Sequence, residues 1–125
     1  MATAFHRVCD QNGWDHKPGS AVVPLPDGRK QKVFVEVVED GGEELLRIYT
    51  VVGDASILDE IRMQAALKIN FRMRHGALAI MDQKLVILDT FPAEGADEEV
   101  LQDSAEYMAK RADDYEKYIY RIDVH

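Results

Sequence analysis

The chain has 125 residues, of which 46% are hydrophobic, and its 15 Lys and Arg against 23 Asp and Glu give a formal net charge of −8. This length is enough to bury one hydrophobic core, so we predict a single domain over residues 1–125. The acidic balance argues against binding to nucleic acid or to an anionic membrane, because both rest on clustered Lys and Arg. The single cysteine, Cys9, excludes an intrachain disulfide and a thiolate zinc site.

The first part of the chain predicts one helix and three strands. Phe5, Val8 and Cys9 fall at i, i+3 and i+4, which predicts a short amphipathic helix over residues 2–12. Residues 21–25 are apolar, and the prolines at 24 and 26 make them an edge strand. Residues 33–38 and 45–52 alternate with the period of strands, and the charged, glycine-containing segment 39–43 predicts a hairpin between them.

The second part predicts a helix, two strands and a long final helix. Ser56 and Asp59 match a capping box, apolar residues then recur every fourth position from Ile57 to Ile69, and Gly76 is a candidate terminator. Residues 77–81 and 84–91 predict a tight hairpin, whose apolar run 85–88 suggests a strand covered on both faces at the sheet centre. An apolar stripe from Leu101 to Ile119 predicts a helix of about six turns.

The expected order is therefore α-β-β-β-α-β-β-α. This order defines an α+β fold in which an antiparallel sheet of about five strands is flanked by helices. The N-terminus lacks a basic segment followed by an apolar run, and no stretch approaches the length of a spanning helix. We therefore expect a cytoplasmic protein that does not contact a membrane.

Several stretches in this order resemble a known group of proteins. They are residues 45–48, 66–70, 84–88 with the following Pro92, and 112–115. The chain resembles the YbjN-like family and the class of type III secretion chaperones that shares its fold. This resemblance implies a small, acidic, cytoplasmic homodimer that binds other polypeptides and catalyses nothing. It also implies that dimerisation uses the helix 56–70 and the strand that follows.

The central hairpin carries the sharpest functional signal. One face of its two strands is predicted to enter the core, through Val33, Val35, Val37, Leu46, Ile48 and Val52. The opposite face is too apolar for an ordinary solvent face, because it carries Phe34, Glu36, Val38, Leu45, Arg47, Tyr49 and Val51. Either the N-terminal helix covers this second face or a partner polypeptide binds it. We predict a partner-binding surface formed by Phe34, Leu45, Arg47, Tyr49 and Val51.

The charged residues are also unevenly distributed. Arg62, Lys68, Arg72 and Arg74 follow one another without an intervening acid, whereas the C-terminal segment is strongly acidic. Two interpretations remain open. The two segments pack together within one chain, or the basic one complements an acidic surface across a dimer or on a partner.

Residues able to perform catalysis or bind a metal do not form a known pattern. Asp10, Asp15 and His16 lie near Cys9 but lack the spacing of a metal site, and Ser20 lacks the context of a nucleophile. We therefore predict no catalytic residue, no cofactor and no metal. The alternative is a small-ligand-binding protein or enzyme, with a pocket between sheet and helices around Trp14, Tyr49 and a carboxylate or His16. A third possibility is a structural subunit of a larger assembly.

Overall fold

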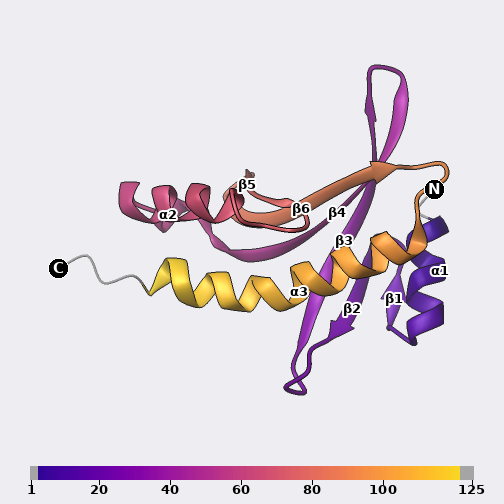
Figure 1. Cartoon of the computed structure of the whole chain (residues 1–125), viewed down its shortest axis with the longest axis horizontal. Coiled ribbons are helices and arrows are strands. Elements are labelled where there is room, and N and C mark those ends of the chain that lie inside the picture. Colours follow the sequence, from indigo (N-terminus) through magenta and orange to yellow (C-terminus); the bar gives the residue numbers. More distant parts are fainter. Residues whose placement is uncertain (1–2, 122–125) are drawn as a thin grey trace.

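The fold is an antiparallel sheet whose strands follow the order β1-β2-β3-β4-β6-β5 (Figure 1). The computed structural model describes residues 3–121. The strands are β1 (His16–Lys17), β2 (Ser20–Pro24), β3 (Lys30–Asp40), β4 (Glu43–Asp54), β5 (Ala77–Met81) and β6 (Lys84–Pro92). The helices are α1 (Thr3–Asn12), α2 (Glu60–Asn70) and α3 (Glu98–Tyr120), with a single 3₁₀ turn, η1 (Ala55–Ile57), before α2.

This architecture confirms the predicted α+β class and the predicted order of its main elements. The two-residue strand β1 is an addition that extends the sheet beyond β2. The apolar run in β6 is covered on both faces, as predicted, because Leu85, Val86 and Ile87 are all buried. Its position differs from the prediction, since β6 lies between β4 and the edge strand β5 instead of at the sheet centre.

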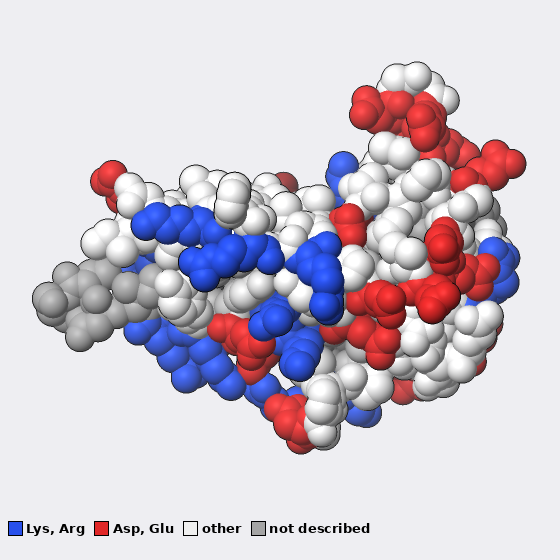
Figure 2. All heavy atoms as spheres, in the orientation of Figure 1, with Lys and Arg blue, Asp and Glu red and all other residues white. Residues whose placement is uncertain are grey.

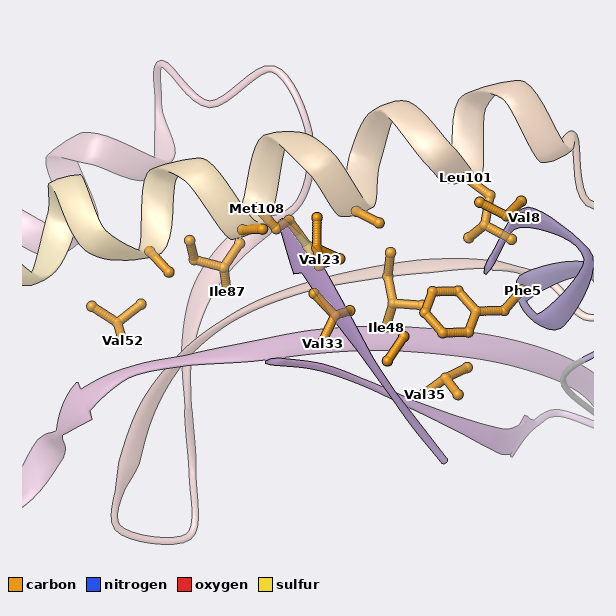
Figure 3. Packing of buried hydrophobic residues seen from close by; sticks show 14 of the residues in the cluster. Phe5, Val8, Val23, Val33, Val35, Ile48, Val52, Ile87, Leu101 and Met108 are labelled. Carbon is orange, nitrogen blue, oxygen red and sulfur yellow. The ribbon is translucent and has the colours of Figure 1, made fainter. Parts of the chain in front are cut away.

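All three helices pack against the same face of the sheet. Helix α3 contacts β2, β3, β4 and β6, α1 contacts α3, and α2 contacts both β5 and α3. Buried side chains of α1 and α3 meet those of the sheet in one cluster, in which Phe5 lies beside Ile48, and Leu101 beside Val8 (Figure 3). We call the side of the sheet under the helices the inner face and the opposite side the outer face.

Strand alternation assigns each residue of the central hairpin to one of these faces. The predicted core residues Val33, Val35, Leu46, Ile48 and Val52 are buried on the inner face. Val37 shares this face but is 37% exposed. The reason is its position near the hairpin tip, which projects away from the helices (Figure 1).

Helix α2 starts later and is less buried than the sequence pattern predicts. Its N-cap is Asp59, whose carboxylate accepts a hydrogen bond from the Arg62 backbone N–H at 2.9 Å, whereas Ser56 belongs to the preceding 3₁₀ turn. Of the predicted stripe, Ile57 and Ile61 are exposed. The helix ends at Asn70, so Gly76 does not terminate it and instead immediately precedes β5. No helix within residues 3–121 has the length and apolar character needed to cross a membrane.

Candidate functional site

The outer face of the sheet is lined by rows of side chains from neighbouring strands. The register of the ladder places Phe34, Tyr49, Leu88 and Ala77 side by side across β3, β4, β6 and β5. A second row joins Val51, Val86 and Ala79, and a third joins Glu36, Arg47 and Thr90. Towards the hairpin tip, Val38, Leu45 and Pro92 form a fourth row. The outer face therefore carries apolar rows on both sides of one charged row, which contains Glu36 and Arg47.

Two stacked aromatic rings lie at the centre of this surface, and a lysine contacts one of them. The rings of Phe34 and Tyr49 stack at 5.1 Å between centroids with an interplanar angle of 16°. The Nζ of Lys32 lies 5.2 Å from the Phe34 centroid, a cation–π contact. Burial raises the pKa of Tyr49, and the nearby carboxylates of Glu36 and Asp82 raise it further, so its hydroxyl stays protonated at neutral pH.

Arg47 supplies the charge in the middle of the apolar rows. One of its guanidinium nitrogens, Nη1, lies 3.4 Å from Glu36 Oε1. Its Nε is buried and has no hydrogen-bond partner among the described residues. An arginine with unused donors beside stacked aromatic rings is the combination that often dominates protein–protein contacts.

The structure thus brings together all five residues predicted for partner binding. Phe34, Leu45, Arg47, Tyr49 and Val51 are each partly exposed on the outer face. Sequence reasoning missed Leu88, Ala77 and Ala79, which extend the same surface over β6 and β5, and it missed Val86, which lies buried beside them. Alternation along residues 84–91 could have identified Val86 and Leu88, but only the pairing of β6 with β4 places them beside Tyr49 and Val51.

An open hollow of about 960 Å³ continues this surface at the turn between β5 and β6. It is lined by Val51, Gly53, Asp54, Asp82, Gln83 and Lys84. Gly53 follows a β-bulge, where the register between β4 and β6 shifts. The bulge bends the strand, and the hollow lies beside this bend.

The N-terminal helix does not cover the outer face. Its buried residues Phe5, Val8 and Cys9 belong to the inner cluster, and its helix neighbour is α3. Arg7 also pairs with Glu98 at the start of α3, with Nε 2.7 Å from Oε2. The alternative in which the N-terminal helix covers this face is therefore wrong, because α1 packs on the other side of the sheet.

The pocket predicted for the alternative function does not form. Trp14 is buried in the inner cluster, whereas Tyr49 lies on the outer face. His16 pairs with Asp10, with Nε2 2.8 Å from Oδ1, and its ring stacks on His6. Because Trp14 and Tyr49 lie on opposite faces of the sheet, they cannot line one ligand site together.

The environment of Cys9 suits a packing residue. Burial raises the pKa of its thiol to about 11, and the charge of Asp10 adds to this effect. The thiol is therefore protonated at neutral pH and a weak nucleophile. Among residues 3–121, no group of three or more His, Cys, Asp or Glu side chains is placed to hold a metal ion.

A second apolar surface lies where α2 meets the edge strand β5. Phe71 is 94% exposed and Leu67 is 68% exposed, and Ile80 of β5 is also exposed. A hollow of about 410 Å³ between the two elements is lined almost entirely by apolar groups, including Met63, Ala66 and Leu85. This is the helix and the strand to which the sequence assigned dimerisation.

Three of the basic residues that follow Glu60 form no ion pair with α3 in the described part of the chain. Within residues 3–121, Lys68, Arg72 and Arg74 form no ion pair, and α3 places Lys110 and Arg111 near them. In Figure 2 the basic side chains gather around α2 and the middle of α3, whereas acidic ones gather at the hairpin tip and the start of α3. Ion pairing with α3 is therefore not observed for Lys68, Arg72 and Arg74 among residues 3–121.

Comparison with solved structures identifies the same fold in another protein. The chain is similar to one in the crystal structure of the ExsC–ExsE complex, with a TM-score of 0.60 and 12% sequence identity over 95% of this chain and 96% of that one. At this identity the likeness shows the fold alone. No family model matches the sequence, and no curated protein is significantly similar to it. The resemblance to the YbjN-like family therefore gains no support from these comparisons.

Proposed function

We propose that this protein is a non-enzymatic polypeptide-binding module, of the chaperone or adaptor type, that binds its partner on the outer face of the sheet. The observation that carries the proposal is the arrangement of the layers. All three helices pack on the inner face, so within residues 3–121 no helix covers the outer face, where Val86 is buried but Phe34, Tyr49 and Val51 are partly exposed. A contiguous apolar patch bounded by charges is typical of an interaction surface.

Two further observations support this function. The chain that shares the fold was crystallised in a complex, ExsC–ExsE, and the sequence resembles type III secretion chaperones. The resemblance also implies a cytoplasmic setting and a single module over residues 1–125. Of the residues considered for a ligand-binding pocket, Trp14 and Tyr49 lie on opposite faces of the sheet, which counts against an enzyme built around them.

Substitution at the centre of the aromatic pair tests this proposal. Tyr49→Asp places a carboxylate beside Phe34 and Glu36, which opposes an apolar partner but leaves the inner core intact. We expect affinity capture from the lysate of the native host, followed by mass spectrometry, to yield one stoichiometric protein with the wild type and to lose it with Tyr49→Asp. The same loss should appear when the purified partner is added back.

A matched control separates this effect from the added charge. Val100→Asp introduces the same group at an exposed apolar position in the first turn of α3, away from the outer face. We expect this variant to capture the partner as the wild type does, and both variants to keep a thermal midpoint within a few degrees of it. A folded Tyr49→Asp protein that still captures the partner fully would exclude the outer face as the binding surface.

We also propose that the protein is a homodimer through α2 and β5. Three exposed apolar side chains, Leu67, Phe71 and Ile80, lie on these two elements. The outer edge of β5 has no neighbouring strand in the described sheet, so its backbone groups are available for pairing. The dimer surface and the outer face are formed by different residues, so the two proposals fail independently.

Light scattering on the purified protein tests the dimer. We expect a dimer for the wild type at dilute concentration and a monomer for Phe71→Glu, with Val100→Glu as the control that stays dimeric. Phe71 is almost fully exposed, so its replacement removes little from the monomer core. A wild-type protein that scatters as a monomer would remove the dimer without affecting the proposal for the outer face.

A further inference from the structure

A groove on the helical side of the molecule collects basic and aromatic side chains. It consists of two adjoining hollows between α2, the turn after it and α3, of about 620 and 340 Å³. The two hollows share Tyr107 and Arg111, so together they form one elongated site. We call this site the basic groove. It is separate from the outer face, because α2 and α3 cover the inner face.

The cations of the basic groove are largely without partners. They are Lys68, Arg72, Arg74, Lys110 and Arg111. Among residues 3–121, only Arg111 of these five forms an ion pair, with its Nη1 3.6 Å from Asp114 Oδ2. The Nε of Arg111 is buried and has no hydrogen-bond partner among the described residues. The five positive charges outnumber the carboxylates of Asp103 and Glu106 that line the same groove, on a chain with a net charge of −8.

The floor of the basic groove is aromatic. The guanidinium carbons of Arg74 and Arg111 lie 5.1 and 5.3 Å from the centroid of the Tyr107 ring, and Tyr115 and Tyr118 continue the floor. Burial alone would raise the pKa of Tyr107. Hydrogen bonds from the Arg74 backbone N–H and from Tyr115, together with the Arg111 charge, outweigh burial and lower that pKa. The groove therefore stabilises negative charge at the Tyr107 oxygen.

We propose that the basic groove binds an acidic segment of a partner polypeptide. Guanidinium groups pair with carboxylates through two parallel hydrogen bonds. The tyrosine rings, with Ala65 and Ile69 beside them, offer apolar contact to the intervening side chains. This proposal adds a second contact surface to the binding module proposed above, and it stands on different residues.

The shape and charge of the groove favour a polypeptide over other anions. A free phosphate would occupy one hollow, whereas an extended chain uses both. Asp103 and Glu106 line one end, and a continuous phosphate backbone would meet repulsion there as well as from the net charge of the chain. A segment in which acidic and apolar residues alternate avoids that repulsion. It also matches the guanidinium groups and the rings.

Fluorescence anisotropy with a labelled peptide tests the proposal. The probe is a short peptide in which Glu and Leu alternate, and its control has Gln at every Glu position. We expect the wild type to bind the acidic peptide in low salt and Lys68→Glu/Arg72→Glu to bind it at least about tenfold more weakly. Lys17→Glu/Lys30→Glu gives the same net charge change at exposed lysines outside the groove and should bind within about twofold of wild type.

Further outcomes decide between possible ligands. Equal binding of the Gln peptide, equal loss in both charge-reversal variants, or no binding by the wild type would overturn the proposal. The proposal would also be overturned if inorganic phosphate or a dT oligonucleotide displaced the labelled peptide at lower concentrations than the same peptide without its label. A wild-type dimer that dissociates with salt and in Lys68→Glu/Arg72→Glu would assign the groove to the acidic hairpin of a second copy instead. Tyr49→Asp should leave peptide affinity unchanged, which keeps this test separate from that of the outer face.

Discussion

The two faces of the sheet differ in this molecule, because helices cover the inner face and leave the outer face partly exposed. Ile48 and Tyr49 are consecutive in β4, yet Ile48 is fully buried under the helices and Tyr49 lies partly exposed on the other side. Both faces are rich in apolar residues. The difference is the cover, because α1, α2 and α3 all lie on the inner face. Hydrophobic patterning alone therefore does not distinguish a sheet face covered by helices from one that no helix covers, whereas the placement of the helices does.

The strongest way to test this difference is to truncate neighbouring residues on β4. Ile48→Ala removes side-chain volume from a closed core and should lower the free energy of unfolding by about 2–5 kcal/mol. Tyr49→Ala loses a stacked partner on a partly solvated face and should lower it by about 1 kcal/mol. Urea unfolding of both variants measures the comparison.

The opposite ranking would contradict the assignment of faces. If Tyr49→Ala were as destabilising as Ile48→Ala, the outer face would have to be covered in solution. Val22→Ala offers a control, because Val22 pairs with Lys32 towards the sheet edge and is only partly buried. It should cost less than Ile48→Ala in the same assay.

The local sequence pattern predicted most of the fold, but it did not predict the face of the sheet on which α1 packs. Alternation assigned both faces of the hairpin correctly, since each strand's side chains follow a period of two. The side on which α1 packs could not be read from Phe5, Val8 and Cys9, because an apolar stripe does not specify its partner. The basic groove could not be predicted from the sequence for a related reason. Its cations come from α2, the following turn and α3, and only packing brings Arg74 and Arg111 to the same ring.

The predicted helix boundaries failed for a different reason. The stripe from Ile57 to Ile69 assumed a helix that buries its apolar residues in its own domain. In the structure, α2 packs at the sheet edge, where only Ala66 is fully covered and Ile61 remains exposed. Exposed apolar residues on an amphipathic pattern are therefore better interpreted here as candidates for an interface than as core.

The glycine that precedes β5 tests how closely the segment before β5 must approach β6. Gly76 has φ +71°, and a Cβ there would lie 2.4 Å from the backbone oxygen of Leu88. Gly76→Ala should therefore lower the free energy of unfolding by about 2–4 kcal/mol, through both the left-handed backbone and the clash with β6. Gly28→Ala is the matched variant, since Gly28 has φ +85° with no atom within 4 Å.

Thermal or urea unfolding of these two glycine variants separates the two causes. Gly28→Ala should cost about 1 kcal/mol, from the backbone conformation alone. Similar losses for the two variants would mean that the segment before β5 shifts freely away from β6.

The smallest expected effect on the free energy of unfolding concerns Asp113 of α3, which forms ion pairs with Arg29 and Lys117. The carboxylate of Asp113 accepts hydrogen bonds from Arg29 at 3.0 and 2.5 Å and lies 2.9 Å from Lys117 Nζ. Hydrogen bonding from Arg29, with a further contribution from Lys117, lowers the Asp113 pKa to about 2. Because the folded pKa lies below the unfolded value, the stabilisation is complete above about pH 4 and is lost as the pH falls through about 2.

Asp113→Asn should therefore lower the free energy of unfolding by only about 0.5–1 kcal/mol at pH 7, since solvent screens these partly exposed groups. The difference from wild type should shrink between pH 4 and pH 2 in urea unfolding. A difference that stays constant over that range would show that Asp113 stabilises the fold through packing and not through its charge.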